Sequence, residues 1–165
     1  MLIIVNGTVG VGKTWVARTL LCQLDDAAYI EGDVLGFVSD NLIATQSRQK
    51  LALNVACDLI SAYRRLGART IVFDSLFLSP DLMEDFIQRV GEPARVFYLS
   101  AETRSLSARI LKRGRPQAER EVSETQEVER NQRGRFLNGA LGFEIKTDNM
   151  SPDEIADLIK KKAFE

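Results

Sequence analysis

The residues with the clearest chemical pattern lie close to the amino terminus. Positions 7–14 match the pattern G-x-x-x-x-G-K-[ST] without exception. The glycines let the backbone turn tightly, so that its amide groups point at an anion, and the start of a following helix adds the positive end of its dipole. The pattern predicts a triphosphate-binding cradle. Its residues are Gly7, Thr8, Val9, Gly10, Val11, Gly12, Lys13 and Thr14.

Two side chains of this cradle have predicted roles of their own. Lys13 is expected to reach the β- and γ-phosphates, and the Thr14 hydroxyl to ligate Mg²⁺. The alternative is a glycine-rich turn with an exposed lysine and no ligand. It is disfavoured because an apolar strand pattern at 2–5 and a helical pattern at 14–24 flank the motif. Trp15, the next residue, is expected to pack in the core or against a neighbouring helix, and the alternative is a base-stacking residue.

Acidic residues follow two further apolar runs. The run at 70–73 ends at Asp74, and the run at 27–30 leads into Glu-Gly-Asp at 31–33. The carboxyl ends of parallel strands border the ligand crevice of a sheet. We therefore expect Asp74, which resembles the acid of a Walker B strand, to lie near a metal ion or the acceptor substrate. The alternative for Asp74 is a cap or turn residue, and Asp33 has the alternative of capping the next helix.

The elements that must position these residues follow from the hydrophobic pattern. Short apolar runs alternate with segments of helical period, which predicts a parallel sheet with helices on both faces. Ser-Pro pairs at 79–80 and 151–152 mark helix starts, and the second completes a capping box with Glu154. The segment 47–66 places apolar residues on one stripe and ends before Gly67. The expected strands span 2–5, 27–30, 70–73, 94–99 and 142–146.

Length and composition exclude several classes of protein and site. A chain of 165 residues fits one domain, 1–165, and leaves no room for a second catalytic domain. The absence of histidine excludes Ser-His-Asp and Cys-His nucleophiles. Two cysteines define neither a metal site nor a disulfide scaffold, which fits a reducing, cytoplasmic setting. A net charge of −1 argues against a general attraction to nucleic acid, and no segment resembles a signal peptide or a membrane span.

The order of the remaining motifs narrows the class. The base-reading Asn-Lys-x-Asp of GTPases is absent, and the chain is short for an ATPase motor, which leaves a small kinase. After the cradle come Glu31-Gly32-Asp33, Arg109, Arg113-Gly114-Arg115-Pro116, Glu129-Arg130-Asn131 and Thr147-Asp148-Asn149. In this order the chain resembles the shikimate kinase-like P-loop small-molecule kinases, a group that includes chloramphenicol phosphotransferase and gluconate kinase.

The resemblance implies a fold and roles for the acidic residues. The fold is a three-layer α/β P-loop NTPase fold, with a five-stranded parallel sheet in the order 2-3-1-4-5 and a small lid at about 114–120. Asp33 would orient the acceptor hydroxyl and accept its proton. Glu31 would hold Mg²⁺ through water, and Asp74 would lie near the metal and the substrate.

The resemblance also implies roles for three arginines, whose forked donors suit the charge that develops in phosphoryl transfer. Arg109 would lie against adenine. Arg115, with Arg113 as a possible substitute, would reach the transferring phosphate from the lid and join Lys13 and Asp33 as a catalytic residue. Arg130 would grip an anionic or polar part of the acceptor. The alternative is that these arginines form a solvated helix face.

We therefore predict an enzyme that uses ATP and Mg²⁺ to phosphorylate a hydroxyl of a small molecule, as a monomer or a homodimer. The acceptor is expected to differ from shikimate, because Asp-Ser-Leu-Phe at 74–77 stands where shikimate kinases have a glycine pair. A second hypothesis is a nucleoside, nucleotide or polynucleotide 5′-hydroxyl acceptor, which the local charge of +4 over residues 104–135 favours. A third hypothesis is an ATP-binding regulatory switch without an acceptor.

Overall fold

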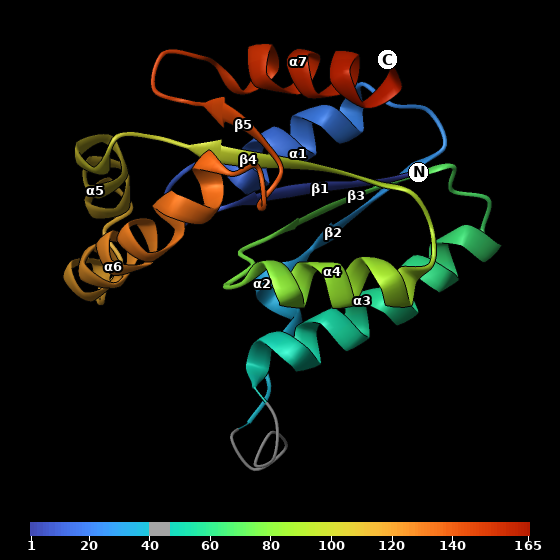
Figure 1. Ribbon diagram of the computed structural model, residues 1–165, viewed down its shortest axis with the longest axis horizontal. Helices are drawn as coiled ribbons and strands as arrows, with labels where there is room; N and C mark the ends of the chain where they lie inside the picture. Colours follow the sequence, from blue (N-terminus) through green and yellow to red (C-terminus); the bar gives the residue numbers. More distant parts are fainter. Residues whose placement is uncertain (40–46) are drawn as a thin grey trace.

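Strands and helices alternate along the chain, as the hydrophobic pattern predicts (Figure 1). The computed structural model describes residues 1–39 and 47–165. The strands are β1 (Leu2–Gly7), β2 (Ala27–Glu31), β3 (Thr70–Ser75), β4 (Ala94–Ser100) and β5 (Phe143–Lys146). The helices are α1 (Lys13–Cys22), α2 (Gly32–Leu35), α3 (Arg48–Arg65), α4 (Pro80–Val90), α5 (Thr103–Lys112), α6 (Ala118–Leu137) and α7 (Pro152–Phe164).

All strand pairs are parallel, and the sheet order is β2-β3-β1-β4-β5. This order confirms the one implied by the family resemblance. Each expected strand corresponds to an observed one, and their boundaries agree within two residues. The expected helix starts are also confirmed, because the hydroxyls of Ser79 and Ser151 accept hydrogen bonds from the amides of Leu82 and Glu154.

Two hydrophobic clusters hold helices on opposite faces of the sheet (Figure 1). In β1, Ile3 and Val5 pack with α1 and α7, whereas Leu2 and Ile4 pack with α3 and α4. This alternation follows from the period of two along a strand, and both faces are apolar because helices cover both. The result is a three-layer structure in which β1 and β3 are fully buried.

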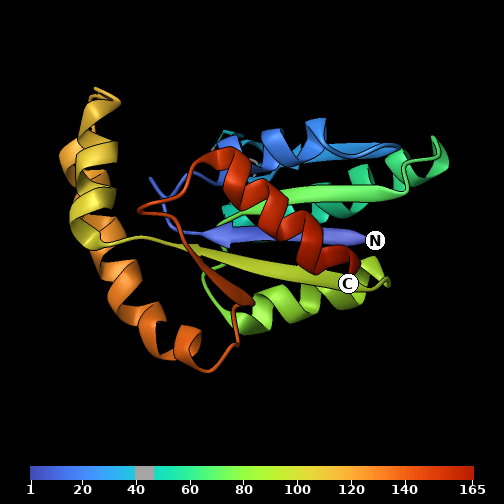
Figure 2. The ribbon, with the colours of Figure 1, turned by 90° about the horizontal axis from the view of Figure 1, so that it is seen from above.

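Helices α5 and α6 lie beyond the carboxyl ends of the strands (Figures 1 and 2). Leu106 and Ile110 are the buried residues of α5. The expected lid at 114–120 covers the α5–α6 connection and the first turn of α6, and its motion stays a prediction. Among the described residues, no helix is both long and apolar enough to cross a membrane. The thiols of Cys22 and Cys57 are free, and the cytoplasmic location stays a prediction.

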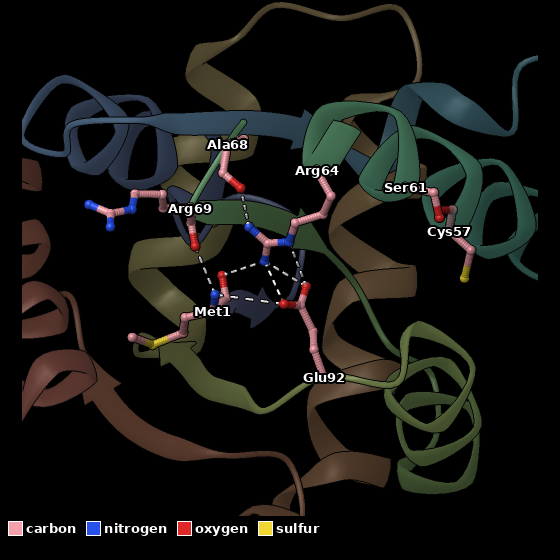
Figure 3. A network of polar contacts seen from close by, with 7 residues as sticks. All are labelled: Met1, Cys57, Ser61, Arg64, Ala68, Arg69 and Glu92. Atoms are coloured by element: carbon pink, nitrogen blue, oxygen red, sulfur yellow. Dashed lines mark hydrogen bonds and ion pairs between the residues drawn. The ribbon is translucent and has the colours of Figure 1, made fainter. Parts of the chain in front are cut away.

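The amino end of the sheet is held by Arg64, the penultimate residue of α3 (Figure 3). Its guanidinium donates to the carbonyl oxygens of Ala68 at 2.6 Å and Met1 at 3.1 Å. It also donates to both carboxylate oxygens of Glu92, at 2.6 and 2.7 Å. The Met1 amino group donates to the carbonyl oxygen of Arg69 at 2.8 Å. These contacts join α3 to the residues just before β1, β3 and β4, at the end opposite to the predicted cradle.

Candidate active site

The carboxyl ends of β1, β2 and β3 bring the cradle and both acidic segments together. In the parallel register, Asp74 of β3 lies opposite Val5 of β1 on one side and Glu31 of β2 on the other. The cradle leaves β1 two residues after Val5, and α2 follows Glu31 directly. The strand order therefore places Asp74 between the cradle and the Glu-Gly-Asp segment.

Lys13 is held at the first turn of α1 with its side chain nearly covered. Gly12, the N-cap of α1, has a φ of 104°, a left-handed conformation that favours glycine. Only 5% of the Lys13 side chain is exposed, and its Nζ donates to the carbonyl oxygen of Thr8 at 3.4 Å. The cation therefore lies along the inside of the loop.

The carboxylate of Asp33 faces this cation. Oδ2 of Asp33 lies 3.6 Å from Nζ of Lys13, and half of the Asp33 side chain is exposed. The alternative of a helix cap is wrong, because Glu31 is the N-cap residue of α2 and no side chain caps that helix. Asp33 is thus a solvent-accessible carboxylate next to the lysine of the cradle.

Thr14 and Asp74 form the second polar pair of the site. The Thr14 hydroxyl donates to Oδ2 of Asp74 at 2.9 Å. Asp74 is fully buried inside β3, so it is not a cap residue. Burial raises the pKa of Asp74 to about 6, although the positive charge of Lys13 and the Thr14 hydrogen bond act in the opposite direction. Its other oxygen, Oδ1, is buried and has no hydrogen-bond partner among the described residues.

These oxygens fit a metal ion that arrives with a nucleotide. Across residues 1–39 and 47–165, no group of three or more acidic or cysteine side chains could hold a metal. Mg²⁺ commonly binds one or two carboxylates, keeps several waters and takes its other ligands from substrate phosphates. The Thr14 hydroxyl and the free oxygen of Asp74 match this partial donor set. The Glu31 carboxylate instead pairs with Arg18 at 3.0 Å.

Arg109 is the one predicted arginine that the structure brings to the cradle. From α5 it donates to the Val11 carbonyl oxygen at 3.5 Å and to the hydroxyl and carbonyl oxygens of Thr147, both at 3.1 Å. It therefore joins the cradle to the segment after β5.

Arg115 and Arg130 are exposed, and their polar contacts are with residues of α6 rather than with the cradle. Arg115 forms an ion pair with Glu121 at 3.5 Å, and 58% of its side chain is exposed. Arg130 is exposed on α6 and donates to the Gln126 carbonyl oxygen of the preceding turn. Both contacts are those of a solvated helix region, so the catalytic and acceptor roles of these arginines stay predictions.

A buried polar network on α6 was not predicted from the sequence. The Thr8 hydroxyl of the cradle donates to Oε1 of Glu129 at 2.7 Å, and the Tyr98 hydroxyl contacts the same oxygen at 3.4 Å. Gln132 accepts from Tyr98 and donates to the Phe77 carbonyl oxygen. The motif at 129–131 contains Glu129, but the family resemblance implies a role only for its neighbour Arg130.

A second unpredicted contact anchors the start of the cradle. Oδ1 of Asn6 accepts hydrogen bonds from the amides of Gly7 at 2.8 Å and Phe77 at 3.1 Å. Because Phe77 follows β3, this amide side chain links the cradle to the segment that carries Asp74. A polar residue at the end of the apolar run in β1 was the only sequence signal for it.

The expectation for Trp15 was wrong, because 71% of its surface is exposed. The core-facing positions of α1 are taken by Val16, Ala17 and Leu20, and Trp15 points away from that face. The aromatic side chain therefore lies on the surface directly beside Thr14 in the sequence.

Comparison with known proteins supports this fold. A family model described as AAA domain matches residues 2–138. No curated protein matches the chain. A tunicamycin resistance protein of Deinococcus radiodurans is similar in structure, with 23% identity, a TM-score of 0.74, and coverage of 98% of this chain and 94% of that chain.

Two solved kinases share the same architecture. A shikimate kinase from Bacteroides thetaiotaomicron is 13% identical, with a TM-score of 0.69 and coverage of 100% of this chain and 99% of that chain. A gluconokinase from Sinorhizobium meliloti 1021 is 18% identical, with a TM-score of 0.63 and coverage of 98% and 95%. The five-stranded P-loop kinase fold expected from the motif order is thereby confirmed.

Proposed function

The chain belongs to the AAA domain family, and from this premise we propose that it is a kinase that transfers the γ-phosphoryl group of ATP to a hydroxyl of a small molecule. Its fold is shared with structures named for shikimate and gluconate phosphorylation. The observation that carries the proposal is the 3.6 Å approach of Lys13 Nζ and Asp33 Oδ2. A cation for the phosphates and an accessible acid for the acceptor meet at this point.

Catalysis of phosphoryl transfer depends mainly on positioning and on electrostatic stabilisation. The amides of the cradle and the Lys13 ammonium would hold the β- and γ-phosphates. Asp33 would turn from Lys13 to the acceptor hydroxyl, orient its oxygen toward the γ-phosphate and accept its proton. The half exposure of Asp33 is what allows an acceptor to reach it.

The Thr14 hydroxyl and Asp74 would hold a Mg²⁺ ion, with Glu31 acting through water once released from Arg18. When bound, the ion neutralises charge on the β- and γ-phosphate oxygens. The Thr14 hydrogen keeps its bond to Asp74 Oδ2, so the lone pairs of the hydroxyl oxygen are the part available to the ion.

The three arginines have proposed roles outside the group formed by Lys13, Asp33, Thr14 and Asp74. Arg109, already at the junction of the cradle and Thr147, would lie against the adenine base. Arg115 would leave its ion pair with Glu121 and reach the transferring phosphate on lid closure, which also excludes water. Arg130 would contact a polar part of the acceptor.

A screen of hydroxyl-bearing metabolites and nucleosides for acceptor-dependent ADP release tests the proposal. Lys13→Ala is expected to lower the acceptor-dependent rate at least about 100-fold, because it removes the charge that positions the donor phosphates. Lys161→Ala, at an exposed site on α7, is the matched control and should keep the wild-type rate. Wild-type transfer by Lys13→Ala would contradict the proposal. A nucleoside as the accepted compound would support the 5′-hydroxyl alternative.

A further inference from the structure

Tyr29 of β2 lies on the same face of the sheet as Asp74. The register pairs Tyr29 with Val72 and Glu31 with Asp74, and residues two apart in a strand point to the same side. Tyr29 and Val72 both belong to the hydrophobic cluster beneath α1 and α7. Tyr29 and Asp74 therefore both face α1, the helix that supplies Thr14.

The Tyr29 hydroxyl and Oδ1 of Asp74 are complementary polar atoms. Both are buried, and neither has a hydrogen-bond partner among the described residues. The register places Tyr29 diagonally from Asp74 on the neighbouring strand, and Thr14 donates to the same carboxylate, so these groups share one location. A phenol donates its proton, and a carboxylate oxygen accepts. Buried polar groups are nearly always paired. A hydrogen bond between these two atoms would satisfy both of them.

We infer that Tyr29 is a positioning residue of the metal–nucleotide site, whose hydroxyl donates to Oδ1 of Asp74 when nucleotide is bound. Thr14 keeps its bond to Oδ2, so two hydroxyl donors then hold the carboxylate in one orientation. Each carboxylate oxygen has two lone pairs, and Oδ1 therefore still presents one to the ion. The inference rests on the proposed function and adds to it a residue that no sequence motif contains.

A role through Asp74 predicts an effect on metal-dependent binding that a packing role does not. Groups that orient a metal ligand typically change metal affinity about 10- to 100-fold when they are removed. If Tyr29 only packs in the core, removal of its hydroxyl should leave the Mg²⁺ dependence of ATP affinity unchanged. Trp15, the single tryptophan, follows Thr14 and is exposed, so its fluorescence can report nucleotide binding at the cradle.

The experiment is a titration of wild type and Tyr29→Phe with ATP, in Mg²⁺ and in EDTA, followed by Trp15 fluorescence and by calorimetry. We expect Tyr29→Phe to raise the Kd about 10-fold or more in Mg²⁺ and to leave the Kd in EDTA unchanged. Tyr63→Phe on α3, in the cluster on the other face, is the matched control and should behave as wild type. The same Mg²⁺ dependence in Tyr29→Phe as in wild type would overturn the inference.

The outcomes of this titration distinguish a failure of the inference from a failure of the proposed function. If wild type binds no ATP, the proposed function fails; if it binds ATP more tightly with Mg²⁺ and Tyr29→Phe does so equally, the inference alone fails. In an Asp74→Asn background, Tyr29→Phe should have no additional effect on Mg²⁺ dependence. An effect that persists there would overturn the inference. Tyr29→Met, which keeps an apolar side chain, should reproduce the loss if Tyr29→Phe does not fold.

Discussion

At the scale of single residues, the site contains a carboxylate whose burial opposes folding. Asp74 is fully buried, and burial raises its pKa from 3.8 to about 6. The folded state therefore binds the Asp74 proton more tightly than the unfolded chain does. By linkage, the contribution of this group to stability is most favourable below about pH 4 and becomes less favourable as the pH rises to about 6.

We predict that Asp74→Asn stabilises the fold at neutral pH. The amide has no charge to desolvate and can still accept the hydrogen bond from Thr14, so the free energy of unfolding at pH 7.5 should rise by about 2 kcal/mol. The gain should fall to less than half at pH 4.5, and toward zero below about pH 4, where Asp74 is protonated in both states. Chemical denaturation of both proteins at the two pH values, without nucleotide or metal, measures this. An equal difference at both pH values would contradict the pKa assignment.

At the scale of elements, the junction of β2 and α2 requires a residue without a side chain. A Cβ at Gly32 would lie 2.7 Å from the Asp74 carbonyl oxygen and 2.8 Å from the Phe73 ring. Glycine therefore allows β2 to end closely against β3. That close approach is what places Asp33, one residue later, beside Lys13.

We predict that Gly32→Ala lowers the free energy of unfolding by about 1–3 kcal/mol, because the new methyl group overlaps backbone and an aromatic ring in the core. The matched control is Gly134→Ala on α6, where a Cβ meets nothing within 4 Å. That change should stabilise the protein by about 0.5–1 kcal/mol, since alanine is the better helix former. Urea denaturation of both variants measures the contrast. Effects of the same sign would contradict the packing argument.

At the scale of the whole molecule, stability and chemistry are concentrated at opposite ends of the sheet. The Arg64 and Glu92 side chains, about three-quarters buried, join four segments at the amino end (Figure 3). The cradle, Asp33 and Asp74 lie at the carboxyl end, where parallel strands leave their connecting loops. Changes at the Arg64 cluster should therefore alter stability without altering nucleotide affinity.

We predict that Glu92→Ala lowers the free energy of unfolding by about 1–3 kcal/mol, because the Arg64 guanidinium loses its carboxylate partner while remaining largely buried. Asp85→Ala is the control. It removes an exposed ion pair with Arg89, and such pairs contribute less than about 1 kcal/mol. Thermal unfolding and ATP titration of each variant measure both quantities. A loss of ATP affinity in Glu92→Ala at temperatures where it is folded would contradict the separation.

The sequence by itself determined the features that depend on neighbouring residues. Strand and helix positions follow from local hydrophobic periods, and the capped starts of α4 and α7 follow from Ser-Pro pairs. The cradle is a run of eight consecutive residues, so its presence needed no tertiary information. The strand order came from the resemblance in motif order rather than from any local pattern.

Only the tertiary structure decided which distant side chains meet. Thr14 and Asp74 are 60 residues apart, and Thr8 and Glu129 are 121 apart, so their contacts depend on strand order, register and the path of α6. The same physical reason explains why Glu31 pairs with Arg18 and why Tyr29 and Asp74 lie on one face of the sheet. A local pattern specifies how a segment folds, but the partner of a side chain is set by the segments packed against it.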